Sequence, residues 1–220
     1  MHRTDAPATF MNPSDRQKTH LALAWLPLAM MVLLSGCSLG PEAAVVPSVS
    51  PEEAAQRAMA DYDTNKDGFL DSNELELCPA LKSALKKLDT NNDGRISAQE
   101  IADRLSKFQA SKSGLVGVSC RVQLDEVPLE GAIVTFVPER FMGPSFQTAS
   151  GVSNARGGVQ LMVPGQSAPG VQWGYYRIEV SKKDAAGQEM VPARYNTATT
   201  LGCEVATDGN KALNLELVSN

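Results

Sequence analysis

Two stretches of twelve residues, 63 to 74 and 89 to 100, carry side chains with oxygen atoms at alternate positions. In both stretches an Asp, an Asn and an Asp stand first, third and fifth, a Gly stands sixth and a Glu stands twelfth. Calcium is a hard cation that takes about six to eight oxygen ligands at roughly 2.3 to 2.6 Å, and a loop of this length can wrap around one ion. The residue types and their spacing therefore predict two bound calcium ions.

The position of each residue in its loop assigns the ligands. Alternate side chains and one backbone carbonyl face the ion, and the Glu at the twelfth position supplies two oxygens. The residue at the ninth position acts directly or through water, and Gly68 and Gly94 permit the sharp turn at the sixth. The predicted ligands are Asp63, Asn65, Asp67, the carbonyl of Phe69, Asp71 and Glu74 in the first loop, and Asp89, Asn91, Asp93, the carbonyl of Arg95, Ser97 and Glu100 in the second.

Other interpretations of these loops are weaker. A surface turn rich in Asp, Asn and Gly can bind nothing, but two complete matches in tandem argue against this. A loop that had lost metal binding and kept only a structural role would not need a Glu at the twelfth position, yet both loops have one. Magnesium fits less well, because it demands short octahedral bonds and keeps its water.

The two loops resemble EF-hands, in which one helix enters and another leaves each calcium loop. Apolar residues recur at helical intervals around both loops, so the segments can bury one face against each other. They are Ala55, Ala58, Met59 and Tyr62 before the first loop, Leu77, Leu81, Leu85 and Leu88 between the loops, and Ile101, Leu105 and Phe108 after the second. Leu70 and Ile96 fall where paired EF-hands form a short β-bridge.

The segment between the loops is unusually short. It spans only residues 75 to 88, and Pro79 is expected to begin a new helix after a very short exit helix. Such a segment leaves little room to open a large hydrophobic groove. Calcium sensors also use Met-rich grooves, whereas Met59 is the only Met between residues 52 and 110. A structural or buffering role for calcium is therefore favoured over a sensor role.

Beyond residues 111 to 114 the pattern changes to short β runs separated by turn residues. The predicted strands are 115 to 124, 132 to 137, 159 to 163, 175 to 181, 199 to 206 and 212 to 218. This number of short strands within about 100 residues predicts an antiparallel β-sandwich. The expected fold class is α+β multidomain, a helical EF-hand pair followed by the sandwich. The expected parts are a signal peptide at 1 to 36, a tether at 37 to 51, the EF-hand pair at 52 to 110 and the sandwich at 115 to 220.

The second half resembles the carboxypeptidase regulatory-like domains of bacterial lipoproteins, notably those of planctomycetes. The residues that carry the resemblance are 116 to 118 (VGV), 127 to 139 (VPLEGAIVTFVPE), 174 to 180 (GYYRIEV), 191 to 196 (VPARYN) and 199 to 201 (TTL). The resemblance implies a transthyretin-like or immunoglobulin-like sandwich with no catalytic residues of its own. Where that family commonly has a Thr-Asp-x-x-Gly turn, residues 153 to 158 read SNARGG, so no metal or ligand role is implied for this turn.

The first 37 residues have the features of an export signal. Arg16 and Lys18 precede an apolar run at 21 to 34, whose length of about 14 residues suits a signal peptide better than a membrane span of roughly 20. The ending LSGC at Cys37 resembles the lipobox of bacterial lipoproteins and implies that Cys37 carries a lipid. An uncleaved membrane anchor is the alternative. Residues 39 to 51, rich in Pro, Ser and small residues, form the expected tether.

The lipid would hold the protein to a membrane of the cell envelope. Ser38 follows Cys37, and the Asp that commonly retains lipoproteins in the inner membrane is absent there. By this resemblance the expected destination is the outer membrane.

Three further cysteines, Cys78, Cys120 and Cys203, follow the lipobox. Exported proteins form disulfides readily, and Cys120 and Cys203 stand in the first and the penultimate predicted strands. A disulfide between them would close a long loop, which the chain-entropy model values at roughly 4 kcal/mol. Two buried free thiols are the alternative, and Cys78 is expected to be a small core residue.

The sequence argues against an enzyme and against nucleic-acid binding. His2 and His20 both precede Cys37, so the mature chain would contain no imidazole for a catalytic triad or a zinc site. No segment suggests a Ser-Lys dyad or a pair of catalytic carboxylates. The net charge is −5, and no stretch collects Lys and Arg with aromatic residues.

These observations together predict a calcium-binding, lipid-anchored exported protein with a structural or protein-interaction role and an unnamed protein partner. One alternative is an accessory or regulatory subunit of an exported enzyme, with the sandwich as the docking surface. A second alternative is glycan binding near Trp173, Tyr175 and Tyr176, which is weaker because aromatics at strand spacing are more often core residues.

Overall fold

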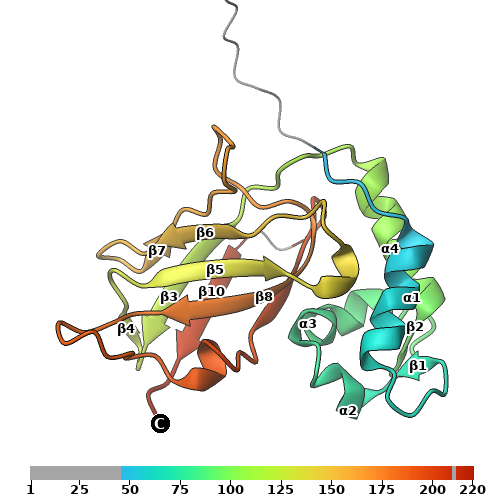
Figure 1. Ribbon diagram of the computed structural model, residues 1–220, viewed down its shortest axis with the longest axis horizontal. Helices are drawn as coiled ribbons and strands as arrows, with labels where there is room; N and C mark the ends of the chain where they lie inside the picture. The colour runs from blue at the N-terminus through green and yellow to red at the C-terminus, as the bar shows by residue number, and fades with distance from the viewer. Residues whose placement is uncertain (1–45, 210–211) are drawn as a thin grey trace, which may run out of the picture. The chain divides into compact units, whose positions relative to one another are not determined.

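The computed structural model describes residues 46 to 209 and 212 to 220. The predicted signal peptide, the lipidation site Cys37 and the first part of the tether lie outside these residues. The described helices are α1 (Pro51–Tyr62), α2 (Ser72–Leu75), α3 (Pro79–Leu88) and α4 (Ala98–Ala110), and a strand-rich part follows them (Figure 1). This order confirms the predicted fold class.

Local features of the sequence fix where the helices begin. The Ser50 side chain caps α1, and Pro51 occupies a position where its missing N–H is no loss. α3 begins at Pro79 as predicted, after the single turn of α2. α2 and α4 begin inside the two acidic loops, because Asp71 and Ser97 each form a capping box with the Glu three residues later. None of the helices in the described ranges combines the length and apolar character that a membrane span requires.

The two acidic loops pair through β1 (Phe69–Leu70) and β2 (Ile96–Ser97), which are antiparallel. Leu70 lies opposite Ile96, which confirms the predicted β-bridge, and both side chains are fully buried. Leu77 departs from the prediction, because its side chain is 58% exposed. α2 ends before this residue and α3 begins after it, so the helical period that would bury Leu77 is interrupted.

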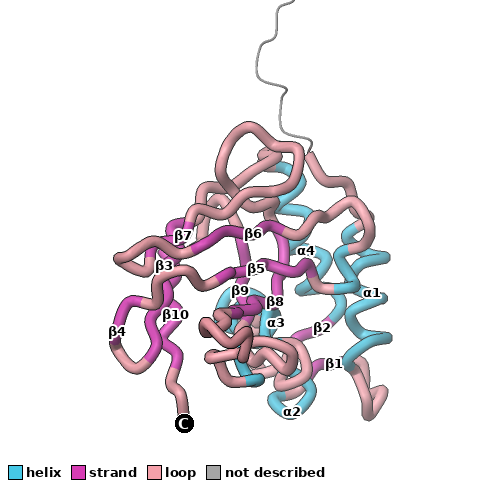
Figure 2. The backbone as a smooth tube through the Cα atoms, turned by 60° about the vertical axis from the view of Figure 1, so that its left-hand side comes forward, coloured by secondary structure: helices cyan, strands magenta, loops and turns pink. Residues whose placement is uncertain are grey.

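The strands of the second half form two sheets. One has the order β6-β5-β8-β9 with antiparallel neighbours, and the other joins β10, β3 and β4, with β7 also paired to β3. β3 and β10 lie side by side in parallel, the one exception to the antiparallel pairing of these named strands (Figure 2). The strands are β3 (Ser119–Leu124), β4 (Val127–Pro128), β5 (Ile133–Pro138), β6 (Ala149–Val152), β7 (Gly158–Val159), β8 (Gly174–Ser181), β9 (Gly202–Val205) and β10 (Ala212–Leu217).

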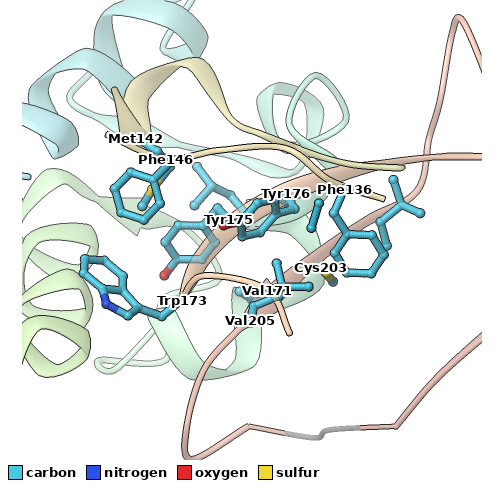
Figure 3. Close-up of a cluster of buried hydrophobic side chains, with 14 of the residues drawn as sticks. Phe136, Met142, Phe146, Val171, Trp173, Tyr175, Tyr176, Cys203 and Val205 are labelled. Carbon is cyan, nitrogen blue, oxygen red and sulfur yellow. The ribbon is translucent and has the colours of Figure 1, made fainter. Parts of the chain in front are cut away.

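Aromatic side chains of the sheet part form the centre of the core. The ring centroids of Phe136 on β5 and Tyr176 on β8 are 6.1 Å apart (Figure 3). Phe108 of α4 lies 5.7 Å from Trp173 and 6.0 Å from Tyr175, measured between ring centroids. Trp173, Tyr175 and Tyr176 are fully buried, so the predicted alternative of a glycan-binding face near them is wrong.

The helical part and the sheet part share one core. α3 lies against β9, and α1 lies against the short 3-10 helix η1 (Arg140–Met142). Gly202 on β9 permits a close approach of α3, because a methyl group there would overlap backbone atoms of Pro79 and Ala80. The buried apolar side chains of the two parts accordingly form a single cluster.

Cys78, Cys120 and Cys203 are buried free thiols, so the predicted disulfide between Cys120 and Cys203 is not formed in this structure. Burial raises the pKa of Cys120 to about 12. Burial also raises the pKa of Cys203, and the nearby Cys120 contributes to this increase. Disulfide formation needs a thiolate, and the apolar surroundings of both sulfurs disfavour that form.

Candidate calcium sites

The first loop begins where α1 ends and offers a carboxylate oxygen that lacks a partner. Asp63 Oδ2 accepts a hydrogen bond from the Gly68 N–H at 3.0 Å. Asp63 Oδ1 is buried and has no hydrogen-bond partner among the described residues. A buried acceptor without a partner is costly, and a cation would satisfy it. The donor set of this loop therefore fits a metal ion at the position predicted for calcium.

The Glu at the twelfth position closes both loops in the same way. Glu74 Oε1 accepts hydrogen bonds from the Thr64 N–H at 2.7 Å and the Asn65 N–H at 3.2 Å, and Oε2 accepts one from the Asp71 N–H at 3.0 Å. These bonds join the exit helix of the first loop to the beginning of that loop. Glu74 is a buried side chain.

The second loop repeats this closure. Glu100 Oε1 accepts hydrogen bonds from the Thr90 N–H at 2.9 Å and the Thr90 hydroxyl at 3.1 Å. Glu100 Oε2 accepts hydrogen bonds from the N–H and the hydroxyl of Ser97, each at 2.9 Å. The predicted twelfth-position ligands therefore occupy equivalent places in the two loops.

The same hydrogen bonds keep both glutamates ionised. Burial by itself would raise the pKa of Glu74 and Glu100. The backbone N–H groups and hydroxyls that face each carboxylate outweigh the burial and hold its pKa below the ordinary value. Both side chains therefore carry the negative charge that a calcium ligand needs.

The backbone of the two loops follows one pattern. Lys66 and Asn92, both at the fourth position, adopt φ angles of 59° and 57°, and Gly68 and Gly94 at the sixth adopt 87° and 80°. Residues other than Gly adopt such positive φ angles uncommonly, so their recurrence at the same place is informative. The sequence predicted the turns at Gly68 and Gly94, but nothing in it indicated the positive φ angle of Lys66.

The side chains at the third and fifth positions fold over the loop backbone. Asn65 Oδ1 accepts from the Asp67 N–H at 2.8 Å, and Asp67 Oδ1 accepts from the Phe69 N–H at 3.0 Å. Asn91 and Asp93 repeat these contacts in the second loop, each at 2.9 Å. Within residues 46 to 209 and 212 to 220, no three Asp, Glu, Cys or His side chains converge as a metal-ligand group. The predicted ligands at the third and fifth positions are therefore engaged with the loop backbone in this structure.

The seventh residues of the loops contact each other across β1 and β2. The Arg95 guanidinium lies over the Phe69 ring at 3.9 Å from its centroid. An Arg95 nitrogen also lies 3.8 Å from an oxygen of Asp93, which is itself a predicted ligand. The second loop therefore has a cation close to one of its carboxylates, and it has Ser97 where the first loop has Asp71.

Polar contacts around the buried Glu139, which the sequence did not reveal, hold the end of α1. The Tyr62 hydroxyl donates to Glu139 Oε2 at 2.9 Å, immediately before the first loop begins at Asp63. The Arg57 guanidinium donates to the Phe141 carbonyl at 3.1 and 2.9 Å. Burial raises the pKa of Glu139, although the Tyr62 hydrogen bond opposes this. The entry to the first loop is thus attached to the sheet part of the molecule.

Comparison with protein families supports the assignment of the loops. A family model described as EF hand matches residues 56 to 78 and 81 to 105. No curated protein and no solved structure matches the chain. The matched residues include both acidic loops, the whole of α2 and parts of α1, α3 and α4. The helical part of the chain is therefore an EF-hand pair, and this assignment implies that it binds calcium.

Proposed function

We propose that this protein is a calcium-binding lipoprotein of a bacterial cell envelope, in which two calcium ions stabilise the EF-hand pair against a β-sandwich. The observation that carries the proposal is the matching closure of the two loops by Glu74 and Glu100, together with the unpartnered Asp63 Oδ1. Calcium is the cation that prefers this mixture of carboxylate, amide and carbonyl oxygens.

The proposed role of calcium is structural or buffering. Phe108 of the second EF-hand packs on the buried rings of Trp173 and Tyr175. Arg57 and Tyr62 of the first EF-hand donate hydrogen bonds to the sheet part. Opening a groove between the helices would break these contacts. A sensor needs a groove that opens at modest cost, so the packing favours a fixed EF-hand pair.

The sandwich and the lipid anchor are proposed from the sequence. The second half resembles a carboxypeptidase regulatory-like domain, which implies a transthyretin-like fold without catalytic residues and an interaction role. The lipobox ending at Cys37 implies a lipid anchor, and Ser38 in place of an Asp after it favours the outer membrane as the destination. We therefore propose a non-enzymatic protein whose sandwich meets a protein partner near that membrane.

Calcium calorimetry tests the proposal. We expect two calcium sites with affinities on the order of 10⁻⁴ M, the range of extracellular modules, and little competition from magnesium. The first loop should bind more tightly, because it offers Asp63, Asp67, Asp71 and Glu74, whereas the second offers three carboxylates, from Asp89, Asp93 and Glu100. Glu74→Gln should remove the tighter site and Glu100→Gln the weaker one. Binding of no calcium would refute the proposed function, and the reverse order would show that loop geometry outweighs the number of carboxylates.

The lipid anchor is tested separately. Cys37→Ser should block lipidation and leave an unprocessed or soluble protein, because serine offers no thiol for the thioether bond to the lipid. Membrane fractionation and the mass of the mature chain report the outcome. Unchanged membrane partition with an unchanged mature mass would show that Cys37 is not the anchor.

A further inference from the structure

A buried carboxylate of the sheet part contacts both helices that flank the second calcium loop. Glu204 on β9 has a side chain that is 3% exposed. It accepts hydrogen bonds from Arg104 of α4 at 2.8 and 3.0 Å, and from the Lys87 ammonium of α3 at 2.6 Å. Arg104 also donates two hydrogen bonds of 2.8 Å to Asp208. We refer to Glu204, Arg104, Lys87 and Asp208 as the loop-two clamp.

The clamp is close to both ends of the second loop. Lys87 lies two residues before Asp89, the first ligand, and Arg104 lies four residues after Glu100, the last ligand. Four residues are about one helical turn, so Arg104 lies on the same side of α4 as Glu100. The clamp therefore fixes the entering and the exiting helix of the second EF-hand relative to each other.

The first EF-hand has no equivalent arrangement in the contacts described. Its entering helix α1 is attached to the sheet part through Arg57 and Tyr62. Its exit helix α2 is a single turn whose main neighbours are α3 and β1, and Leu77 directly after it is exposed. The sheet part thus holds one helix of the first EF-hand and both helices of the second.

Holding both helices favours ion binding at the loop between them. A chelating loop loses conformational freedom when its first and last ligands converge on an ion, and this loss lowers the affinity. If the flanking helices are already fixed by the fold, less freedom remains to be lost. Residues that orient metal ligands from outside the coordination sphere typically change the affinity about 10- to 100-fold when they are replaced.

We infer that Glu204 is a positioning residue for calcium in the second loop, acting through Arg104 and Lys87. This inference rests on the proposed calcium binding, and it assigns to the sheet part a role in a metal site to which it contributes no ligand. The second loop, with fewer carboxylates of its own, would depend on the sheet part for its affinity.

Electrostatic attraction alone makes a different prediction. Glu204→Gln removes a negative charge, so the loss of electrostatic attraction to calcium would weaken binding even if the clamp had no effect. Arg104→Gln and Lys87→Gln remove positive charges and would strengthen binding if attraction alone acted. The clamp predicts weaker binding for all three variants, since each one releases a helix from Glu204. The sign of the effect in Arg104→Gln and Lys87→Gln therefore separates the two explanations.

The test is calcium titration of the full chain in two backgrounds. Glu74→Gln leaves only the second loop to bind, and Glu100→Gln leaves only the first. In the Glu74→Gln background we expect Glu204→Gln and Arg104→Gln to weaken binding about tenfold. Lys87→Gln should weaken calcium binding about threefold, because Lys87 makes only one of the hydrogen bonds to Glu204. The Lys87 side chain is 43% exposed, so this variant should still fold.

Controls distinguish the clamp from general destabilisation. In the Glu100→Gln background the same variants should leave the affinity of the first loop unchanged. Glu216→Gln, at an exposed Glu on β10, should change neither loop. Equal losses at both loops, or tighter binding in Arg104→Gln and Lys87→Gln, would overturn the inference while the proposed function stands. If the Glu74→Gln parent binds no calcium, the proposed function fails for this loop and the inference fails with it.

Discussion

Removal of calcium should lower the midpoint of thermal unfolding by roughly 10 to 20 °C relative to protein with calcium at 100 times its dissociation constant. A ligand at that concentration stabilises the folded state by about 2.7 kcal/mol for each site, so two sites give about 5 kcal/mol. In a chain of this size each kcal/mol moves the midpoint by about 2 to 4 °C. Differential scanning calorimetry in calcium and in chelator measures the shift.

The physical reason is that the folded loops bind the ions and the unfolded chain does not, so calcium shifts the equilibrium towards the folded state. A double variant, Glu74→Gln with Glu100→Gln, should show no calcium-dependent shift and serves as the control. If wild-type protein shows two filled sites by calorimetry but a shift below about 3 °C, the ions do not stabilise the fold as proposed.

Gly202→Ala should destabilise the protein by about 3 kcal/mol, at the upper end of the usual cost of overpacking. The added methyl group would overlap the backbone of Pro79 and Ala80 at the start of α3. Backbone atoms do not move aside as a flexible side chain does, so α3 would have to separate from β9. Urea unfolding monitored by circular dichroism gives the change in the free energy of unfolding.

Gly117→Ala is the matched control for this substitution. A methyl group at Gly117 meets no atom within 4 Å, and neither glycine has a positive φ angle that would strain an alanine. Gly117→Ala should therefore change the stability by less than about 0.5 kcal/mol. Equal effects of the two substitutions would show that α3 and β9 are not packed as closely as described here.

Ligand spacing and the position of Pro79 made the EF-hand part predictable. The loop residues, the start of α3 at Pro79 and the pairing of Leu70 with Ile96 all follow from local sequence. Leu77 was mispredicted because the helical period was extended across a break between α2 and α3. The break depends on where α2 ends, and boundaries are the weakest part of any prediction from pattern.

The sheet part was predictable in type but not in detail. Strands β3, β9 and β10 fall within the predicted runs, and β5 and β8 each exceed theirs by one residue. The run predicted at 159 to 163 contains only the end of β7, and β4 was missed. β6 was missed because Ala149 to Val152 contains Ser and Gly and lacks a strong apolar alternation. Trp173 and Tyr175 are buried by α4, an element far from them in sequence. Contacts of this kind depend on how the helical and sheet parts dock, which local periodicity does not encode.

The same limit applies to the clamp and to the thiols. No sequence pattern distinguishes Glu204 and Asp208 from other acidic residues. Lys87 and Arg104 reach them only because α3 and α4 dock on the sheet part. The sequence placed Cys120 and Cys203 in the first and the penultimate predicted strands, but whether two such sulfurs join depends on local geometry and on thiolate formation.

The parallel pairing of β3 with β10 has a consequence for the order of folding during synthesis. Ser119 pairs with Ala212, roughly 90 residues further along the chain, whereas the contacts that build the EF-hand loops are local. A chain that emerges from the ribosome amino end first can therefore form its helices early, while one edge of β3 stays open until β10 arrives. An open strand edge is a template for pairing with other chains. Glu204 and Asp208 also arrive late, so the second EF-hand would remain unclamped for most of this interval.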